Sequence, residues 1–303
     1  MATETFTTRA STRSRSHRLL GGRRRTVPNV ILRHIILIVL LIALLYPVVW
    51  LLFSSFGPSA EIFVRNGLLR GTWTTENYVQ GWNPLRNLSF GRLFLNSIVI
   101  AVLSILGTVI SCTMAAYAFA RLNFAMRSIL FGFMLVTIML PQQVLIIPQY
   151  ILFQHLGWLN TYLPLIVPRF LAVDGFFVFL MVQFIRGLPR ELDEAARIDG
   201  AGHAMIFVRI VLPLAAPAMA TVALFSFLEA WNDFLGPLLY LTDPSNYTVP
   251  LGLNLFLDSS GNGGSQWGPL FAMCVLSLVP LIAVFLATQR LLTQGIATTG
   301  MKG

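Results

Sequence analysis

Acidic residues are scarce in this chain of 303 residues, and they gather in two places. Four of the twelve fall within the short stretch ELDEAARIDG, as Glu191, Asp193, Glu194 and Asp199. Two more, Glu229 and Asp233, stand beside Asn232 in a stretch that is otherwise apolar. Carboxylates can grip a basic partner surface, stabilise the start of a helix, or accept hydrogen bonds from the hydroxyls of a solute. Which role applies depends on the elements that carry the two groups.

The composition predicts that these elements belong to a membrane protein. Hydrophobic residues make up 56% of the chain and charged residues 11%, which is about half the charged fraction of a soluble domain. Backbone groups in hydrocarbon must pair within the protein, and a spanning helix needs about 20 mostly apolar residues. We therefore predict an all-α integral membrane protein with six transmembrane helices, at residues 31–53, 93–119, 128–147, 162–185, 212–241 and 268–289.

The arginines predict which segments face the cytoplasm, because cytoplasmic loops collect basic residues. If the N-terminus lies inside, the basic residues of the outer segments are limited to Arg65, Arg70, Arg86 and Arg92. Both termini and a loop at 189–217 are then cytoplasmic, while 54–92 and 242–266 form the outer loops. Residues 1–30 are expected to be a disordered, basic cytoplasmic tail. The arginines of this tail could instead bind nucleic acid or target the protein elsewhere. A basic flank at a membrane entry is more often a topology determinant, so no nucleic-acid partner is expected.

The acidic stretch predicts a short helix of about ten residues. Pro189 suits its first turn, the acids complement the positive end of a helix, and Gly200 can close the helix in a left-handed conformation. Ala195 and Ala196 have short side chains, so another protein could approach the helix backbone closely. A second apolar helix is expected after the turn, from the helical spacing of Phe207, Ile210, Val211 and Leu214. The alternative is a solvated loop that happens to be acidic.

The two outer loops differ in composition. The segment 54–92 is expected to form a small packed cap. The segment 242–266 contains the string SSGNGG, and its Gly, Asn and Ser residues are expected to exclude a regular element and to leave the loop mobile.

The second acidic group lies inside the predicted fifth span. Glu229, Asn232 and Asp233 are three and four positions apart, which places them on one face of a continuous helix. Ionisable groups in a span cost about 2.5 to 3.5 kcal/mol and normally face a cavity or a partner. This face could line the path of a solute, with Trp231 offering an aromatic ring. Alternatively, it could pair with a second subunit or cap a kink at Pro237.

A single arginine, Arg169, also falls inside a predicted span. Because it lies five positions from Asp174, the two side chains would not share a face of a regular helix. Arg169 is therefore expected to anchor the end of its span.

No constellation in the sequence predicts an enzyme or a bound cofactor. The histidines are scattered (His17, His34, His155 and His203), and no spacing suits a metal ion. Cys112 and Cys274 lie in apolar runs and are expected to be buried. We find no glycine-rich phosphate loop and no internal repeat. The missing repeat counts against an ion-coupled secondary transporter with Glu229 and Asp233 as ion sites.

Several strings around the acidic stretch carry a resemblance to a known family. The residues Glu194-Ala195-Ala196, Asp199-Gly200-Ala201, Phe207, Ile210, Leu212-Pro213 and Pro217 resemble the EAA loop of ABC importer permeases. The strings FSFLEAWNDFLGPLLYL and GIATTGMKG are similar to the carbohydrate-uptake subfamily, in particular to subunits that correspond to the smaller permease of the maltose importer. The resemblance covers about residues 30 to 303.

This resemblance implies a type I ABC importer permease fold, in which the loop 189–217 is a coupling helix that docks in a groove of a cytoplasmic ATPase. Glu194 would be the key acid, Ala195 and Ala196 the surface of close approach, and Gly200 the turn. Asp199 would contact the partner or cap the helix, and Ala201 completes the motif.

The resemblance also implies the partners. They are a second homologous permease that forms a heterodimer with this chain, two ATPase subunits that hold ATP and Mg, and an extracytoplasmic substrate-binding protein. The location would be the inner membrane of a bacterium. The loop residues Gly261, Asn262, Gly263 and Gly264 would face the binding protein, and the tail 295–303 would contact the ATPase.

The cargo implied by the resemblance is a sugar, either a monosaccharide or an oligosaccharide. Glycerol 3-phosphate importers resemble the same subfamily, so an anionic or other polar solute is the rival. An anion would favour arginines along the path, and Arg169 alone is available in the predicted spans, which favours a neutral sugar.

Overall fold

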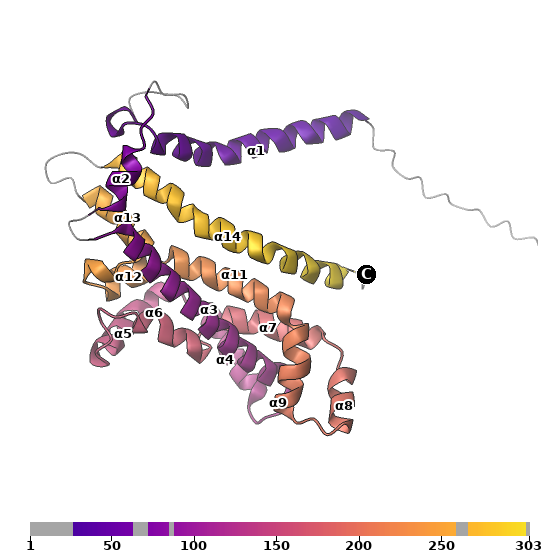
Figure 1. Cartoon of the computed structure of the whole chain (residues 1–303). Coiled ribbons are helices and arrows are strands. Elements are labelled where there is room, and N and C mark those ends of the chain that lie inside the picture. Colours follow the sequence, from indigo (N-terminus) through magenta and orange to yellow (C-terminus); the bar gives the residue numbers. More distant parts are fainter. Residues whose placement is uncertain (1–26, 63–71, 85–87, 259–265, 301–303) are drawn as a thin grey trace, which may run out of the picture. The chain divides into compact units, whose positions relative to one another are not determined.

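The computed structural model describes residues 27–62, 72–84, 88–258 and 266–300 (Figure 1). All regular elements of these residues are helices, which confirms the predicted all-α class. The chain divides into two compact units, residues 1–49 and 50–303, and each is described by itself.

The first unit contains most of helix α1 (Val27–Ser55). Its side chains from Ile31 to Val48 are exposed, and nearly all of them are apolar. Such a helix suits a hydrocarbon environment, in which apolar surface needs no cover from the protein.

The second unit is built around α3 (Phe90–Arg121), a helix of 32 residues. It packs against α7 (Gly175–Gly187) and α11 (Ala216–Asn232) through a core that includes Ala116, Met181, Ile185 and Val222. A second core joins the start of α3 to α11, α13 (Val249–Asp258) and α14 (Trp267–Gly300). Its largest buried side chains include Phe90, Trp231, Phe256 and Met273.

Two of the predicted spans are broken. The segment 128–147 is not continuous, because α4 (Arg127–Ile138) ends before Pro141 and α5 (Gln142–His155) leaves at 104°. The segment 212–241 is also wrong as one helix. Here α11 begins after a bend of 74° and ends at Asn232, and the short α12 (Leu235–Tyr240) follows.

With these corrections the described residues hold four helical segments long enough to span a membrane, or up to six if each bent pair counts as one span. The predicted span 162–185 corresponds to one of the four, Leu163–Gly187, which consists of α6 (Leu163–Ile166), the 3-10 turn η2 (Val167–Leu171) and α7, with residues 172–174 interrupting the helix before α7.

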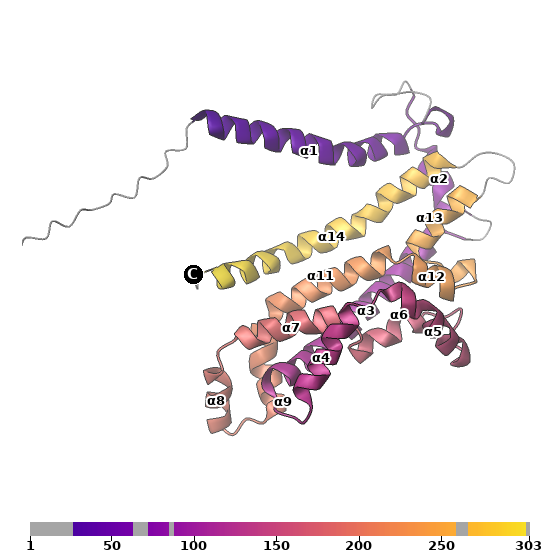
Figure 2. The same cartoon turned by 180° about the vertical axis from the view of Figure 1, so that it is seen from behind.

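The loop 189–217 lies at one end of the second unit, and helices of the two predicted outer loops lie at the opposite end. Figures 1 and 2 show α8 (Glu191–Ile198) and α9 (His203–Ile206) at one end, and α2 (Glu76–Trp82) and α13 at the other. Within 54–92, the amide of buried Asn77 donates to the carbonyls of Ser55 and Gly57, both at 2.8 Å, which holds α2 against the end of α1.

The expectation that 242–266 holds no regular element is wrong. It contains the short turn η4 (Pro244–Asn246) and the ten-residue helix α13. The helix forms because Val249 and Phe256 are buried in one core cluster with Phe90 and Leu93 of α3, so tertiary packing outweighs the polar composition of the loop. Ahead of it, the backbone N–H of Ser245 donates to Asp243 and holds the pKa of that carboxyl below its usual value. The glycine-rich string itself, including Gly261, Asn262, Gly263 and Gly264, lies outside the described residues.

Candidate functional site

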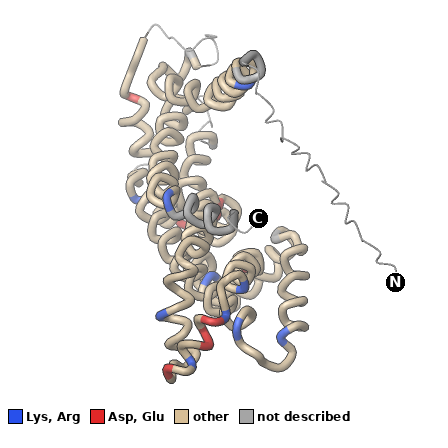
Figure 3. Tube along the Cα trace, turned by 90° about the vertical axis from the view of Figure 1, so that its right-hand side faces the viewer, with Lys and Arg blue, Asp and Glu red and all other residues tan. Residues whose placement is uncertain are grey.

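The acidic stretch forms the predicted helix, α8, which has eight residues and begins at Glu191, two positions after Pro189. Glu191, Asp193 and Glu194 occupy its first turn, where they complement the positive end of the helix. The group is visible in red at the lower end of the tube in Figure 3. Asp199 is the C-cap, and Gly200 follows with φ of +82°, a left-handed conformation that glycine adopts without strain.

The residues of the EAA-like string divide into exposed and packed ones. Glu194, Ala195, Asp199 and Gly200 are exposed. Ala196 and Ala201 are half-buried and pack against the core between α3 and α7. One face of α8 is therefore available to another protein, while the opposite face rests on this chain.

The second helical segment predicted after the turn is present. It consists of α9, a π-helical turn over Phe207–Val211 and α10 (Leu212–Leu214). Ile206 and Val211 are buried in the core beneath it. The ring of Phe207 lies 5.0 Å from that of Tyr117 on α3.

A buried ion pair that the sequence did not predict lies beneath α8. Arg121 Nε, at the end of α3, lies 3.3 Å from Asp193 Oδ2, and the two side chains are 3% and 9% exposed. Arg121 Nη2 also donates to the carbonyl of Leu188 at 2.8 Å. Asp193 thus differs from its neighbours Glu191 and Glu194, because it faces inward. The one sequence signal for this contact was an arginine just beyond the end of the predicted span 93–119.

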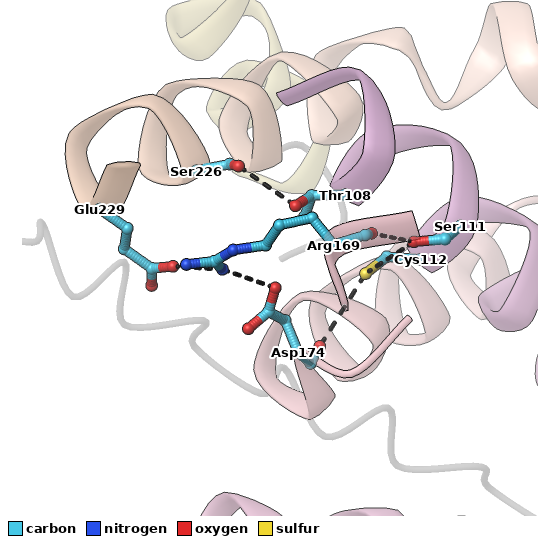
Figure 4. A network of polar contacts seen from close by, with 7 residues as sticks. All are labelled: Thr108, Ser111, Cys112, Arg169, Asp174, Ser226 and Glu229. Atoms are coloured by element: carbon cyan, nitrogen blue, oxygen red, sulfur yellow. Dashed lines mark hydrogen bonds and ion pairs between the residues drawn. The ribbon is translucent and has the colours of Figure 1, made fainter. Parts of the chain in front are cut away.

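A second ion cluster lies farther along the bundle (Figure 4). Arg169 Nη1 contacts Asp174 Oδ2 at 2.7 Å and Glu229 Oε2 at 3.1 Å. Arg169 therefore bridges two carboxylates, and its interpretation as a simple span-end anchor is wrong. The carbonyl of Arg169 accepts a bond from Ser111 Oγ at 2.8 Å, and a bond between Thr108 and Ser226 lies nearby at 3.2 Å.

The expectation that Arg169 and Asp174 point apart failed because the chain is not a regular helix there. The 3-10 turn η2 ends at Leu171, Ala172 has φ of +52°, and Asp174 is the N-cap of α7. The left-handed residue interrupts the helix, so Arg169 and Asp174 do not belong to one regular helix and their spacing of five positions does not predict the directions of their side chains.

Glu229 and Asn232 lie three positions apart within α11 and so share a face, but the prediction that Asp233 shares it is wrong. Glu229 is half-exposed and reaches Arg169, whereas Asn232 bonds back to the carbonyl of Leu228 at 2.8 Å. Asp233 has left the helix, and its Oδ1 accepts from the backbone N–H of Gly236 at 3.0 Å. Trp231 is 2% exposed, donates to the carbonyl of Ser277 and stacks on Phe227, so its ring belongs to the core.

The ion cluster borders a cavity of about 410 Å³. Its charged lining consists of one arginine and three carboxylates, Arg169, Asp174, Glu229 and Asp233, which makes the wall negative on balance. Neutral polar and aromatic groups complete it, among them Gln143, Gln149, Phe153, Phe177 and Tyr240. Such a mixture of hydrogen-bonding groups and rings can hold a polar, uncharged solute.

The part of the chain that the structure describes holds no cluster of three His, Cys, Asp or Glu side chains suited to a metal ion. Cys112 and Cys274 are unpaired thiols on different helices, and Cys112 is buried.

A helical membrane bundle with broken spans, a polar cavity and an exposed acidic helix at one end has the features of a membrane transport subunit. Residues 107–298 match the family of binding-protein-dependent transport system inner membrane components, and the chain belongs to that family. The resemblance to ABC importer permeases is thereby confirmed.

Known relatives cover nearly the whole chain. It is 35% identical over 277 residues to the trehalose/maltose transport system permease protein of Thermococcus litoralis, covering 90% of this chain and 98% of that protein. It is 32% identical over 267 residues to the sn-glycerol-3-phosphate transport system permease protein of Yersinia enterocolitica, covering 87% and 94%.

A solved structure shares the fold. A chain from a bacterial ABC transporter involved in the import of the acidic polysaccharide alginate matches with a TM-score of 0.75. The match covers 93% of this chain and 99% of that one, at 21% sequence identity. The predicted type I importer permease fold is confirmed.

Proposed function

We propose that this chain is one of two homologous permease subunits of an ATP-driven importer for a neutral sugar. The partners are a second permease, two ATPase subunits that carry ATP and Mg, and an extracytoplasmic binding protein that delivers the sugar. Membership of a binding-protein-dependent transport family carries the proposal. The position of α8 and of α13 at opposite ends of the bundle supports it, because one loop must meet the ATPase and the other the binding protein. On this topology both termini are cytoplasmic.

The exposed face of α8 is the surface that docks on the ATPase. That face includes Glu194, Asp199 and the short side chain of Ala195, and Gly200 ends the helix. Acidic side chains on a docked helix fix its position on a basic partner surface. A surface that placed acidic groups opposite them would be repelled. The face that includes Ala196 and Ala201 holds the helix to its own bundle.

The cavity beside Arg169 supports a neutral cargo. Two of its three carboxylates already surround Arg169, the one arginine among the described lining residues, so an anionic solute would meet net repulsion. Glu229 is the carboxylate with the greatest side-chain exposure in the ion cluster, at 46%. We assign Glu229 to the solute path and Asp233 to capping the break after α11. The rival cargo is glycerol 3-phosphate, which the name of one relative supports.

Reconstitution tests the proposal. The complete complex, assembled in vesicles with the partners from the same gene neighbourhood, is supplied with labelled maltose, trehalose, other oligosaccharides and glycerol 3-phosphate. We expect uptake of a neutral sugar that requires both ATP and the binding protein, and no uptake by this chain alone. Accumulation by the chain alone without nucleotide would overturn the proposal and favour an ion-coupled transporter. Selective uptake of glycerol 3-phosphate would overturn the assignment of the cargo.

A further inference from the structure

The C-terminal end of α3 contacts the chain on both sides of α8. On the N-terminal side, Arg121 donates to the carbonyl of Leu188 at 2.8 Å and lies 3.3 Å from Asp193. On the C-terminal side, Tyr117 O–H donates to the carbonyl of His203 at 3.2 Å. Tyr117 and Arg121 are four positions apart, so they lie on one face of α3. A single helix face thus contacts the chain before, within and after α8.

Burial makes this attachment stiff. The side chains of Arg121 and Asp193 are almost completely covered, and Tyr117 is 7% exposed. Removing one partner of a buried pair leaves an uncompensated charge, so α8 cannot shift away from α3 without a large cost. Apolar contacts surround the pair, since Ala196 and Ala201 pack on the core that contains Ala116 and Ala120.

The same helix reaches the ion cluster at the cavity. About three turns before Arg121, Ser111 Oγ donates to the carbonyl of Arg169, and Thr108, about one further turn back, bonds to Ser226 of α11. No break interrupts α3 between these contacts and its end. A continuous helix therefore connects the loop at α8 with the wall that carries Arg169 and Glu229.

We propose that α3 receives the displacement of α8 and transmits it to the cavity, and that Arg121 and Asp193 are the positioning residues that make α8 and α3 move as one body. The inference rests on the proposed function, in which a partner ATPase pushes on α8. The competing route is α7, which is joined to α8 through the backbone of residues 188–190. If α7 alone transmitted the motion, the pair between Arg121 and Asp193 would be dispensable for coupling.

The first test compares a buried carboxylate with an exposed one. Asp193→Asn removes the buried charge of α8, and Glu76→Gln is the control because it removes an exposed charge from α2, outside the proposed docking face. The measurement is sugar transported per ATP hydrolysed, in purified complexes with all subunits present. We expect Asp193→Asn to lower this ratio by about tenfold, because loss of one partner of a buried ion pair leaves the other charge uncompensated, while Glu76→Gln leaves it unchanged. Equal ratios for the two variants would overturn the inference.

A second test distinguishes coupling from simple stability in one sample. In a chain with Cys112 and Cys274 replaced by alanine, Arg121→Cys and Asp193→Cys are introduced and joined by a flexible bifunctional thiosulfonate reagent. We expect a low ratio before cross-linking, recovery once α3 and α8 are linked, and loss again on adding reductant. A ratio that does not respond to the cross-link would overturn the inference. Failure of the proposed function is recognised separately, because the unmodified complex would then show no ATP-dependent uptake.

Discussion

Arg169 Nη1 lies 2.7 Å from Asp174 Oδ2, across the break between η2 and α7, and the same nitrogen reaches Glu229 of α11. One guanidinium thus joins three segments that meet at the cavity wall. Its removal would leave two carboxylates facing each other in a partly buried site, where charge repulsion is weakly screened.

We expect Arg169→Met to destabilise the protein by about 3 kcal/mol, because it leaves the carboxylates of Asp174 and Glu229 without their positively charged partner. Thermal unfolding of the detergent-purified protein measures the change. Arg209→Met, which alters an exposed arginine, is the control and should cost no more than about 0.5 kcal/mol. The triple variant Arg169→Met, Asp174→Asn, Glu229→Gln should regain most of the loss. A triple variant as unstable as the single one would contradict this account.

Glu194→Lys should abolish ATP-dependent uptake without preventing insertion or folding, because the side chain is exposed and belongs to the proposed docking face. Glu76→Lys makes the same charge change on the exposed surface of α2, at the opposite end of the second unit, and serves as the control, with uptake expected to stay within about twofold. Uptake in vesicles and co-purification of the ATPase are the measurements. Normal uptake by Glu194→Lys would argue against docking at α8.

Gly200→Val should impair coupling through the backbone alone. Gly200 has φ of +82°, while Gly202 has φ of −76°, and a β-carbon at either position meets no atom within 4 Å. A β-branched residue in the left-handed region costs roughly 1–2 kcal/mol or more, whereas the control Gly202→Val meets no such strain. Gly200→Asn should fall between them, since asparagine tolerates this conformation. Equal uptake by the two valine variants would show that the turn does not require glycine.

Gly107→Ala should destabilise the junction of α3 with η2. A β-carbon there would lie 2.7 Å from Phe170 Cδ2 and 3.1 Å from the backbone of Arg169. Overpacking of this kind costs about 1–3 kcal/mol. Gly132→Ala in α4 is the control, because it adds a methyl group to open space. Thermal unfolding of both variants checks the prediction, and similar midpoints would show that Phe170 moves aside freely.

The sequence was sufficient for the features that depend on local chemistry. Apolar runs located the helices, and the acids with Gly200 located α8 and its end, because helix ends and left-handed turns have strong residue preferences. The family resemblance also depended on this local string.

The features that the sequence could not predict depend on chain path and on distant contacts. The pair between Arg169 and Asp174 requires the left-handed turn at Ala172, a residue with no preference for that conformation. Arg121 and Asp193 are distant in the chain, and nothing local distinguishes the inward-facing Asp193 from Glu194. The helix α13 exists because α3 covers its apolar side chains, which loop composition does not reveal.

The polar contacts at the start of α3 have a consequence for biosynthesis. Asn96 donates to the carbonyls of Ser245 and Tyr247, and Ser97 Oγ accepts from the backbone N–H of Val249, at separations of 149, 151 and 152 residues. When α3 leaves the ribosome, these partners have not yet been translated. Asn96 and Ser97 must therefore stay hydrated or be shielded by the insertion machinery until the C-terminal part of the chain arrives. Truncated nascent chains that end before residue 245 cannot reach the native state.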